Sequence, residues 1–282
     1  MNILSLQSWV AHGHVGNAAA MFPLQRLGAE VWAVHTVQFS NHPGYGACGG
    51  RVFDAAEVAD VVAGIAARGV LADCDAVLSG YVGTPGIGAA VLDAVARVKA
   101  ANPRALYCCD PVIGDAGRGV YVGEGVAAFF AEAAIPRADI ATPNHFELEY
   151  LTGRHVATLA DAKAAVAALR GRGPRCVLVT SLRTEATPDD AIDLLASADG
   201  GFFLLRTPKL DLAAKGTGDA IAALFLLHWL RTRDAARGLS ESASALFGVL
   251  RRTAEARAPE MLLIAAQEEL VTPSRRFAAQ AV

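Results

Sequence analysis

Cysteine is scarce in this sequence and is nowhere spaced to hold a metal ion. The five cysteines form an odd set with no C-x-x-C pair: Cys48, Cys74, Cys108, Cys109 and Cys176. All but Cys48 lie in or beside apolar runs, where a thiol is usually a small buried hydrophobic group. The pattern argues against a zinc site and against a disulfide framework, and it predicts a reducing, cytoplasmic location.

Runs of like charge and long apolar stretches are also missing. Charged residues make up 19% of the chain, the net charge is −3 and there is no basic run, so nothing favours nucleic acid or an anionic membrane as a partner. Residues 1–5 have no basic lead before an apolar region, so we expect no signal peptide. The most apolar segment, Ala220–Leu230, contains His228 and is too short to span a bilayer; it is typical of a core helix.

Several common nucleotide-binding and hydrolase motifs are absent. Residues 44–49 match G-x-G-x-x-G, but no helical pattern follows and no acidic residue stands at the distance that a dinucleotide site requires. None of the four lysines follows a glycine and precedes serine or threonine, so there is no Walker A loop. No G-x-S-x-G turn occurs. His12 and His14 have no further ligands clustered nearby, which favours a loop role over a metal pair.

What remains is an alternation of strand-like and helical patterns in an apolar chain. Hydrophobic residues are 53% of the 282 residues, enough for a large core. Apolar strands that alternate with helices are typical of a mostly parallel sheet covered on both faces, and no linker or repeat divides the chain. The sequence therefore predicts a single-domain α/β fold over residues 1–282, a three-layer αβα sandwich. We expect strands over residues 3–8, 31–37, 76–79, 105–109, 139–141 and 176–179, a hairpin of strands 191–197 and 201–207, helices over 18–27, 55–67, 87–100, 126–133, 145–151, 159–170, 220–230 and 240–256, and a loop over 38–46.

A glycine-rich turn precedes the most apolar helix and carries one carboxylate. The turn reads Gly216-Thr217-Gly218-Asp219, and its glycines permit close backbone approach. Free backbone N–H groups and the helix dipole favour an anion at such a helix start. Asp219 beside that anion would accept a proton from an attacking hydroxyl, which is the arrangement that phosphoryl transfer needs. The alternative is that Asp219 is only a helix-capping carboxylate.

Polar residues also follow the predicted strands, at the sheet edge where open parallel sheets bind ligands. They are Ser8, Tyr81, Asp110, Asn144, Glu147, Thr180 and Ser181. Asp110 and Glu147 are oxygen donors of the kind that Mg²⁺ prefers. The alternative for Asn144 is a helix N-cap, with Glu147 three residues later completing a capping box.

With these residues identified, the chain resembles the pyridoxal kinases of the ribokinase-like superfamily over nearly its whole length. The resembling segments are S-L-Q-S at 5–8, G-H-V-G-N at 13–17, T-V-Q-F-S-N-H at 36–42, L-S-G-Y at 78–81, C-D-P-V at 109–112, T-P-N-H-F-E-L-E at 142–149, V-T-S at 179–181 and G-T-G-D at 216–219. The last segment is typical of the whole superfamily. The Q-F-S-N-H, L-S-G-Y and T-P-N-x-F-E segments narrow the resemblance to the vitamin B6 branch.

The resemblance implies ATP-dependent phosphorylation of the 5′-hydroxyl of pyridoxal, with pyridoxine and pyridoxamine as further substrates. It makes Asp219 the base, and the backbone of Gly216, Thr217 and Gly218 the cradle of the γ-phosphate. It implies that Ser8 binds the pyridine ring between Val37, Phe39, His42, Pro43 and Tyr81. It assigns ATP and Mg²⁺ to Asp110, Asp115, Tyr121, Thr142, Asn144, Glu147, Thr180, Ser181, Lys209, Leu210, Gly216 and Thr217, with Asp110 and Glu147 nearest the metal. Family members are commonly homodimers and often use K⁺.

Two residues depart from the family pattern. Pro43 stands where the family usually has a threonine that contacts substrate, and Lys215 stands where an apolar residue is usual. Pro43 bears on affinity and vitamer preference, and Lys215 either adds charge near the phosphates or extends to solvent. Two other functions remain open: a kinase for another hydroxymethyl heterocycle such as hydroxymethylpyrimidine, and a B6-binding protein without catalysis.

Overall fold

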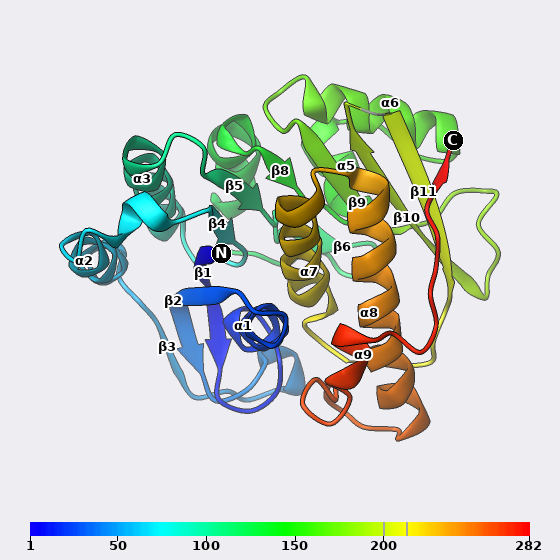
Figure 1. Ribbon diagram of the computed structural model, residues 1–282, viewed down its shortest axis with the longest axis horizontal. Coiled ribbons are helices and arrows are strands. Elements are labelled where there is room, and N and C mark those ends of the chain that lie inside the picture. The colour runs from blue at the N-terminus through cyan, green and yellow to red at the C-terminus, as the bar shows by residue number, and fades with distance from the viewer. Residues whose placement is uncertain (200, 213) are drawn as a thin grey trace.

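A ten-stranded sheet forms the middle layer of the molecule (Figure 1). The computed structural model describes residues 1–199, 201–212 and 214–282. The strand order is β12-β11-β10-β9-β8-β5-β4-β1-β2-β3. The strands are β1 (Asn2–Val10), β2 (Glu30–Phe39), β3 (Gly50–Val52), β4 (Ala76–Ser79), β5 (Leu106–Cys109), β8 (Ile140–Ala141), β9 (Cys176–Leu182), β10 (Ala191–Ala198), β11 (Gly201–Pro208) and β12 (Gln280–Ala281). A separate two-stranded ribbon pairs β6 (Gly114–Asp115) with β7 (Gly119–Val120).

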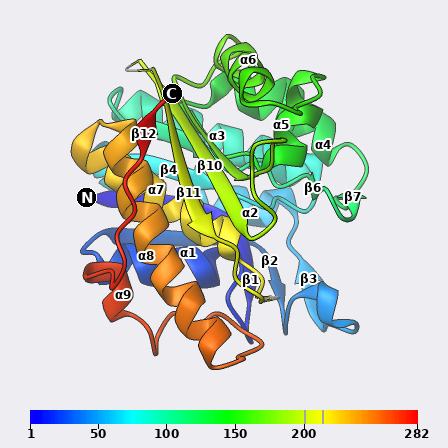
Figure 2. The same ribbon diagram turned by 90° about the vertical axis from the view of Figure 1, so that its right-hand side faces the viewer.

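The central part of the sheet is parallel, as the sequence predicts. The neighbouring pairs from β2 through β1, β4, β5 and β8 to β9 are all parallel. The predicted hairpin is also confirmed, because β10 pairs antiparallel with β11, with Ala191 opposite Pro208 and Ala198 opposite Gly201. Figure 2 shows these two long strands side by side, with the C-terminal segment running past them to β12.

Helices cover both faces of the sheet, so the three-layer arrangement is confirmed. The helices are α1 (Asn17–Arg26), α2 (Ala55–Ala66), α3 (Pro85–Ala101), α4 (Val126–Phe129), α5 (His145–Thr152), α6 (Leu159–Arg170), α7 (Thr217–Thr232), α8 (Ala235–Glu255) and α9 (Glu268–Val271). One core lies between the sheet and α2 to α6, and the other between the sheet and α1, α7 and α8. No helix formed by the described residues is long and apolar enough to cross a membrane.

Helix α7 is buried along most of its length because it packs on one face of the sheet with α1 and α8 on either side of it (Figure 1). Residues from Ala220 to Leu227 are all buried, which explains why this segment shows no polar face. The helix begins after Gly216, which has φ +80°, and ends before Arg233, which has φ +52°. Because α7 is packed along its length, the position of its N-terminus relative to the sheet is fixed.

The predicted boundaries differ from the structure in several places. Strand β2 continues through Phe39, because residues 37–39 pair with the edge strand β3, so the loop predicted over 38–46 starts later. Thr180 and Ser181 lie within β9 and not after it. Helix α8 begins at Ala235, five residues earlier than predicted, where the side chain of Asp234 caps it. Strands β3, β6, β7 and β12 are two or three residues long and were not predicted.

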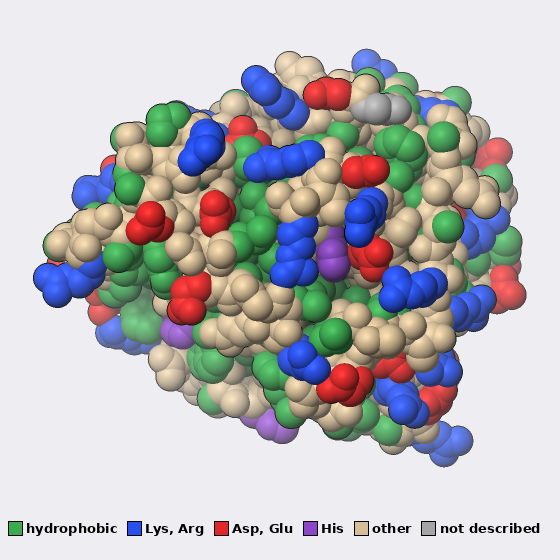
Figure 3. All heavy atoms as spheres, viewed as in Figure 1, with side chains coloured by type: hydrophobic (Ala, Val, Ile, Leu, Met, Phe, Trp, Pro, Cys, Tyr) green, Lys and Arg blue, Asp and Glu red, His purple; other side chains and the backbone are tan. Residues whose placement is uncertain are grey.

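Charged side chains of both signs are interspersed on the face drawn in Figure 3. Lysine and arginine side chains alternate there with aspartate and glutamate, so this face carries no extended patch of one sign.

Candidate active site

A cavity of about 790 Å³ lies at the carboxyl ends of the central strands and in front of the N-terminus of α7. The sequence-predicted residues gather there, although they come from segments far apart in the chain. The lining includes Ser8, Val37, Phe39, His42, Pro43, Tyr81, Asp110, Asp115, Tyr121, Thr142, Asn144, Glu147, Thr180, Ser181, Leu210, Gly216, Thr217, Gly218 and Asp219. Lys209 is exposed and is not part of the lining, while its backbone N–H donates to the carbonyl oxygen of Asp190 at 2.7 Å.

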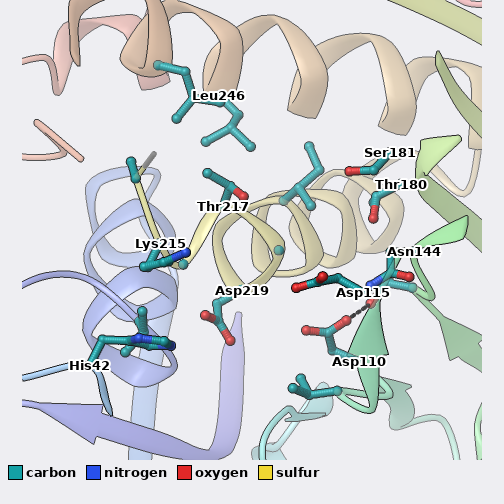
Figure 4. Close-up of a pocket in the computed structure, with 18 of the residues that line it drawn as sticks. His42, Asp110, Asp115, Asn144, Thr180, Ser181, Lys215, Thr217, Asp219 and Leu246 are labelled. Atoms are coloured by element: carbon teal, nitrogen blue, oxygen red, sulfur yellow. Dashed lines mark hydrogen bonds between the residues drawn. The ribbon is translucent and has the colours of Figure 1, made fainter. Parts of the chain in front are cut away.

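Asp219 lies in the first turn of α7, and its carboxylate faces the cavity (Figure 4). Gly216 is the N-cap residue, so Asp219 does not hold the N-cap position that the capping alternative suggested. Burial raises the pKa of Asp219 to about 6, against the opposing effect of backbone N–H groups of Gly16 and of Asp219 itself. A carboxylate with this pKa is ionised at neutral pH and is a better proton acceptor than an exposed aspartate.

Asp110 lies across from Asp219 at the end of β5 (Figure 4). Its Oδ1 accepts a hydrogen bond from the hydroxyl of Thr142 at 2.8 Å, and only 6% of the residue is exposed. Burial raises the pKa of Asp110 well above its usual value, and the charges of Glu147 and Asp219 raise it further. Three carboxylates thus converge on one buried space, and a cation bound between them would relieve their repulsion.

Glu147 and Asn144 form the capping box at the start of α5 that the sequence suggested. The side chain of Asn144 accepts from the N–H of Glu147 at 2.9 Å, and the Asn144 N–H donates to Oε2 of Glu147 at 2.8 Å. Glu147 Oε1 accepts a further N–H, from Ile113, at 2.9 Å. Burial raises the pKa of Glu147 to about 7, although these backbone bonds oppose the rise. Glu147 therefore fixes the backbone beside the cavity while adding negative charge to it.

Asp115 and Tyr121 reach the cavity from the β6–β7 ribbon and the segment after it. Asp115 is ion-paired with Arg118 at 2.7 Å, and the Arg118 guanidinium lies 5.0 Å from the centre of the Tyr121 ring. Asp115 thus already has a cationic partner, unlike Asp110.

The opposite end of the cavity is built from β1, β2 and the residues that follow β2 and β4. Ser8, Val37, Phe39 and Tyr81 line it. The backbone at Tyr81 is fixed by a hydrogen bond from the Thr36 hydroxyl to the Tyr81 carbonyl at 2.7 Å. These side chains form a mostly apolar wall with two hydroxyls, those of Ser8 and Tyr81, which suits a flat heterocycle.

His42 and Pro43 complete this end and belong to a short turn over Pro43–Tyr45. The ring nitrogen Nδ1 of His42 accepts from the N–H of Gly44 at 2.9 Å. Burial lowers the pKa of His42, and the nearby charge of Lys215 lowers it further, so the ring is neutral. In Figure 4 the Lys215 side chain points into the cavity above His42, so of the two alternatives for this lysine the structure favours added charge beside the turn.

Sequence reasoning missed one apolar side of the lining. Ile192 and Leu194 of β10 and Leu246 and Phe247 of α8 close the side of the cavity near Leu210. In the sequence these residues belong to an apolar helix face and to an alternating strand pattern. Core residues show the same patterns, so the sequence does not distinguish these residues from the core. Apolar side chains of this kind commonly line the part of a pocket that receives a flat ring.

The residues present suit a divalent cation that is shared with a ligand. Among the described residues, no three His, Cys, Asp or Glu side chains are arranged as a metal-binding group. Asp110 Oδ2 makes no hydrogen bond within the described part of the chain, whereas both oxygens of Glu147 do. Magnesium typically takes one or two carboxylates and completes its shell with water and phosphate oxygens.

Comparisons with known proteins agree with this geometry. The family model described as phosphomethylpyrimidine kinase matches residues 53–254. The chain is 59% identical over 284 residues to pyridoxal kinase PdxY of Granulibacter bethesdensis, covering 99% of both chains. It is 58% identical to pyridoxal kinase PdxY of Deinococcus radiodurans, covering 100% of this chain and 96% of the relative.

A solved structure is also similar over the whole length. The pyridoxal kinase of Leishmania donovani in complex with ADP and pyridoxamine superposes with a TM-score of 0.90 at 30% identity, covering 99% of this chain and 98% of the other. The sequence matches and the fold thus point to the same group of kinases. The chain belongs to the pyridoxal kinase family.

Proposed function

We propose that the cavity phosphorylates the 5′-hydroxyl of pyridoxal with ATP, and that Asp219 is the general base. The observation that carries this assignment is the Asp219 carboxylate, which faces the cavity directly beside the N-terminus of α7 and whose pKa burial raises to about 6. As the substrate oxygen attacks the γ-phosphorus, its proton passes to Asp219. The new O–P bond forms while the bond from the γ-phosphorus to the β-phosphate oxygen breaks, and ADP leaves.

The first turn of α7 supplies the site for the transferred phosphoryl group. As at every helix N-terminus, the first backbone N–H groups of α7 have no acceptor within the helix. Here they point toward the cavity, where they can bind an anion. They act on the negative charge of the phosphoryl oxygens without moving, which is the property that favours a transition state over a ground state. We assign this role to Gly216, Thr217 and Gly218.

The two ends of the cavity separate the two substrates. The wall that contains Ser8, Phe39 and Tyr81 accepts the pyridine ring, and the apolar side that contains Leu210 and Leu246 accepts the adenine. Asp219 and the turn before it lie between the two ends, where the hydroxyl and the γ-phosphate must meet. Pyridoxine and pyridoxamine share the 5′-hydroxymethyl group, so they are further substrates, and Pro43 affects the preference among the three.

An ATP-dependent kinase of this family requires a divalent cation, and we propose Mg²⁺ held through Asp110, with Glu147 adding negative charge behind it. When bound, the cation neutralises charge on the phosphate oxygens. Use of K⁺, assembly as a homodimer, a cytoplasmic location and a single domain over residues 1–282 remain predictions of the sequence. Replacement of K⁺ by Na⁺ in the assay and sedimentation of the purified protein test the first two.

The experiment is the substitution Asp219→Asn, assayed with pyridoxal, ATP and Mg²⁺. The variant should bind ATP with unchanged affinity and lose turnover by about 10²-fold or more, because no group remains to accept the proton. Turnover close to that of the unsubstituted protein would refute the base assignment.

A substrate panel separates the remaining alternatives. Release of ADP with pyridoxal but not with hydroxymethylpyrimidine is expected. Release only with hydroxymethylpyrimidine supports the other kinase activity, and pyridoxal binding without any phosphorylated product supports a binding protein.

A further inference from the structure

The carboxylate of Glu260 bridges two segments that shape the cavity, although Glu260 itself lies outside the lining. Its Oε1 accepts a hydrogen bond from the hydroxyl of Tyr45 at 2.5 Å. Its Oε2 accepts the backbone N–H of His14 at 3.2 Å. Glu260 lies more than 200 residues after both Tyr45 and His14 in the sequence, and these two are 31 residues apart. The bridge therefore depends on the tertiary fold.

The first segment, residues 40–49, follows β2 and is called the flap here. Its residues His42, Pro43 and Gly44 line the pyridoxal end of the cavity. Tyr45 closes the turn that carries them, and its N–H donates to the carbonyl oxygen of His42 at 3.0 Å. Burial, together with the hydrogen bond to Glu260 and the charge of Glu260, raises the pKa of Tyr45 to about 12, so the hydroxyl remains a donor at neutral pH. Glu260 therefore fixes the one turn of the flap that faces the substrate.

The second segment, residues 12–16, supports the catalytic turn. The carbonyl oxygen of His14 packs against Gly216, at the start of α7. Two residues later, the N–H of Gly16 stabilises the Asp219 carboxylate and lowers its pKa. By holding the N–H of His14, Glu260 fixes the backbone that touches both the phosphate-binding turn and the base.

We propose that Glu260 is a positioning residue for phosphoryl transfer, which holds the flap through Tyr45 and the backbone beside Asp219 through His14. This inference rests on the proposed function of the cavity. The two bonds act on different parts of the site: the flap bond holds the turn that lines the pyridoxal end, and the His14 bond holds the backbone beside the base. Loss of one hydrogen bond of this kind typically costs about 1 kcal/mol, which corresponds to a several-fold change in an equilibrium constant.

Kinetics of three variants test the proposal. Tyr45→Phe removes the flap bond to Glu260, with the longer contact of the same hydroxyl to the Pro259 carbonyl oxygen at 3.4 Å, and leaves the His14 bond in place. The KM for pyridoxal should therefore rise about 5-fold, while kcat and the KM for ATP stay within 2-fold. Glu260→Ala removes both bonds, so the same rise in KM should be joined by a fall in kcat of about 10-fold. In the double variant, the KM should stay close to that of Glu260→Ala and well below the product of the two single effects, because both changes break the Tyr45–Glu260 bond.

A matched control is Glu268→Ala, since Glu268 lies on the same C-terminal part of the chain but pairs with Arg26 at 2.9 Å. Its kinetic constants should not change. Unchanged KM values in Tyr45→Phe and Glu260→Ala, or additive effects in the double variant, would overturn the proposal. If Glu260→Ala fails to fold, as judged by circular dichroism, Tyr45→Phe alone decides about the flap. Full turnover in Asp219→Asn would refute the proposed base without altering these KM predictions.

Discussion

Gly216 lies so close to His14 that a β-carbon on residue 216 would stand 1.8 Å from the His14 carbonyl oxygen. The contact joins the loop after β1 to the N-terminus of α7. Position 216 requires glycine for two reasons. Its φ is +80°, which other residues rarely adopt, and backbone atoms of His14 occupy the space that a side chain would need. The turn to which we assign phosphate binding is therefore held in place by a neighbouring backbone.

The two glycines of the turn should respond differently to alanine. Gly216→Ala forces either His14 or the start of α7 to move, so we expect a loss of kcat/KM of about 10²-fold or more, because a shift of about 1 Å in a catalytic site has effects of this size. Gly218→Ala is the matched control, since nothing lies within 4 Å of a β-carbon there. It should retain kcat/KM within about 10-fold in the same steady-state assay. Equal losses in both variants would contradict the structural reason given for Gly216.

The raised pKa of Asp219 predicts an acidic limit to activity. Asp219, the proposed base, can accept a proton only when it is ionised, and its pKa is about 6, so kcat/KM should fall about 10-fold per pH unit once the pH is below that value. The profile should be recorded at saturating Mg²⁺, since a bound cation lowers the pKa of Asp110 beside it. The residual activity of Asp219→Asn should not show this fall at acidic pH. If the variant shows the same fall, a group other than Asp219 causes it.

The same pKa makes Asp219 costly for folding. Ionisation is disfavoured in the folded protein, so the cost is absent below the ordinary value of 3.8 and complete above about 6. Asp219→Asn should therefore gain stability relative to the unsubstituted protein between pH 4 and pH 8. We expect about 1–3 kcal/mol in the free energy of unfolding, reduced by the contact of the carboxylate with the open cavity. Urea unfolding of both proteins at pH 4 and pH 8 measures this gain. If the difference in free energy of unfolding between the two proteins is the same at both pH values, ionisation of Asp219 is not its cause.

Glu147 should matter for stability as well as for activity. Glu147→Ala leaves the N–H groups of Ile113 and Asn144 without their present acceptor, so we expect the free energy of unfolding to fall by about 2–4 kcal/mol. Glu57→Ala is the control, because Glu57 holds the same position in the capping box of α2 but lies at the surface. Its unfolding midpoint in urea should fall much less. Similar losses in the two variants would show that burial of the Glu147 bonds is not the cause.

Local sequence patterns predicted most of the helices and strands and most of the polar residues that line the cavity. Apolar runs bounded by turns located β4 and α6 with their observed ends. Helix α7 begins at Thr217, three residues earlier than predicted, so most of the G-T-G-D segment belongs to its first turn. The pairing of β3 and β12 depends on neighbours far along the chain, so segments this short leave no periodic signal. Leu246 and Phe247 were missed because an apolar helix face looks the same whether it meets the core or a ligand. Lys209 was included through the resemblance, yet its side chain is exposed.

The convergence of Asp110, Glu147 and Asp219 also acts on the nucleotide before any chemistry begins. Free ATP carries several negative charges, and each of these carboxylates that is ionised repels it. ATP that arrives already complexed with a divalent cation brings its own neutralising charge. We therefore expect the site to discriminate between ionic forms of one molecule, with a rate that follows the supply of the complexed nucleotide and not its total amount.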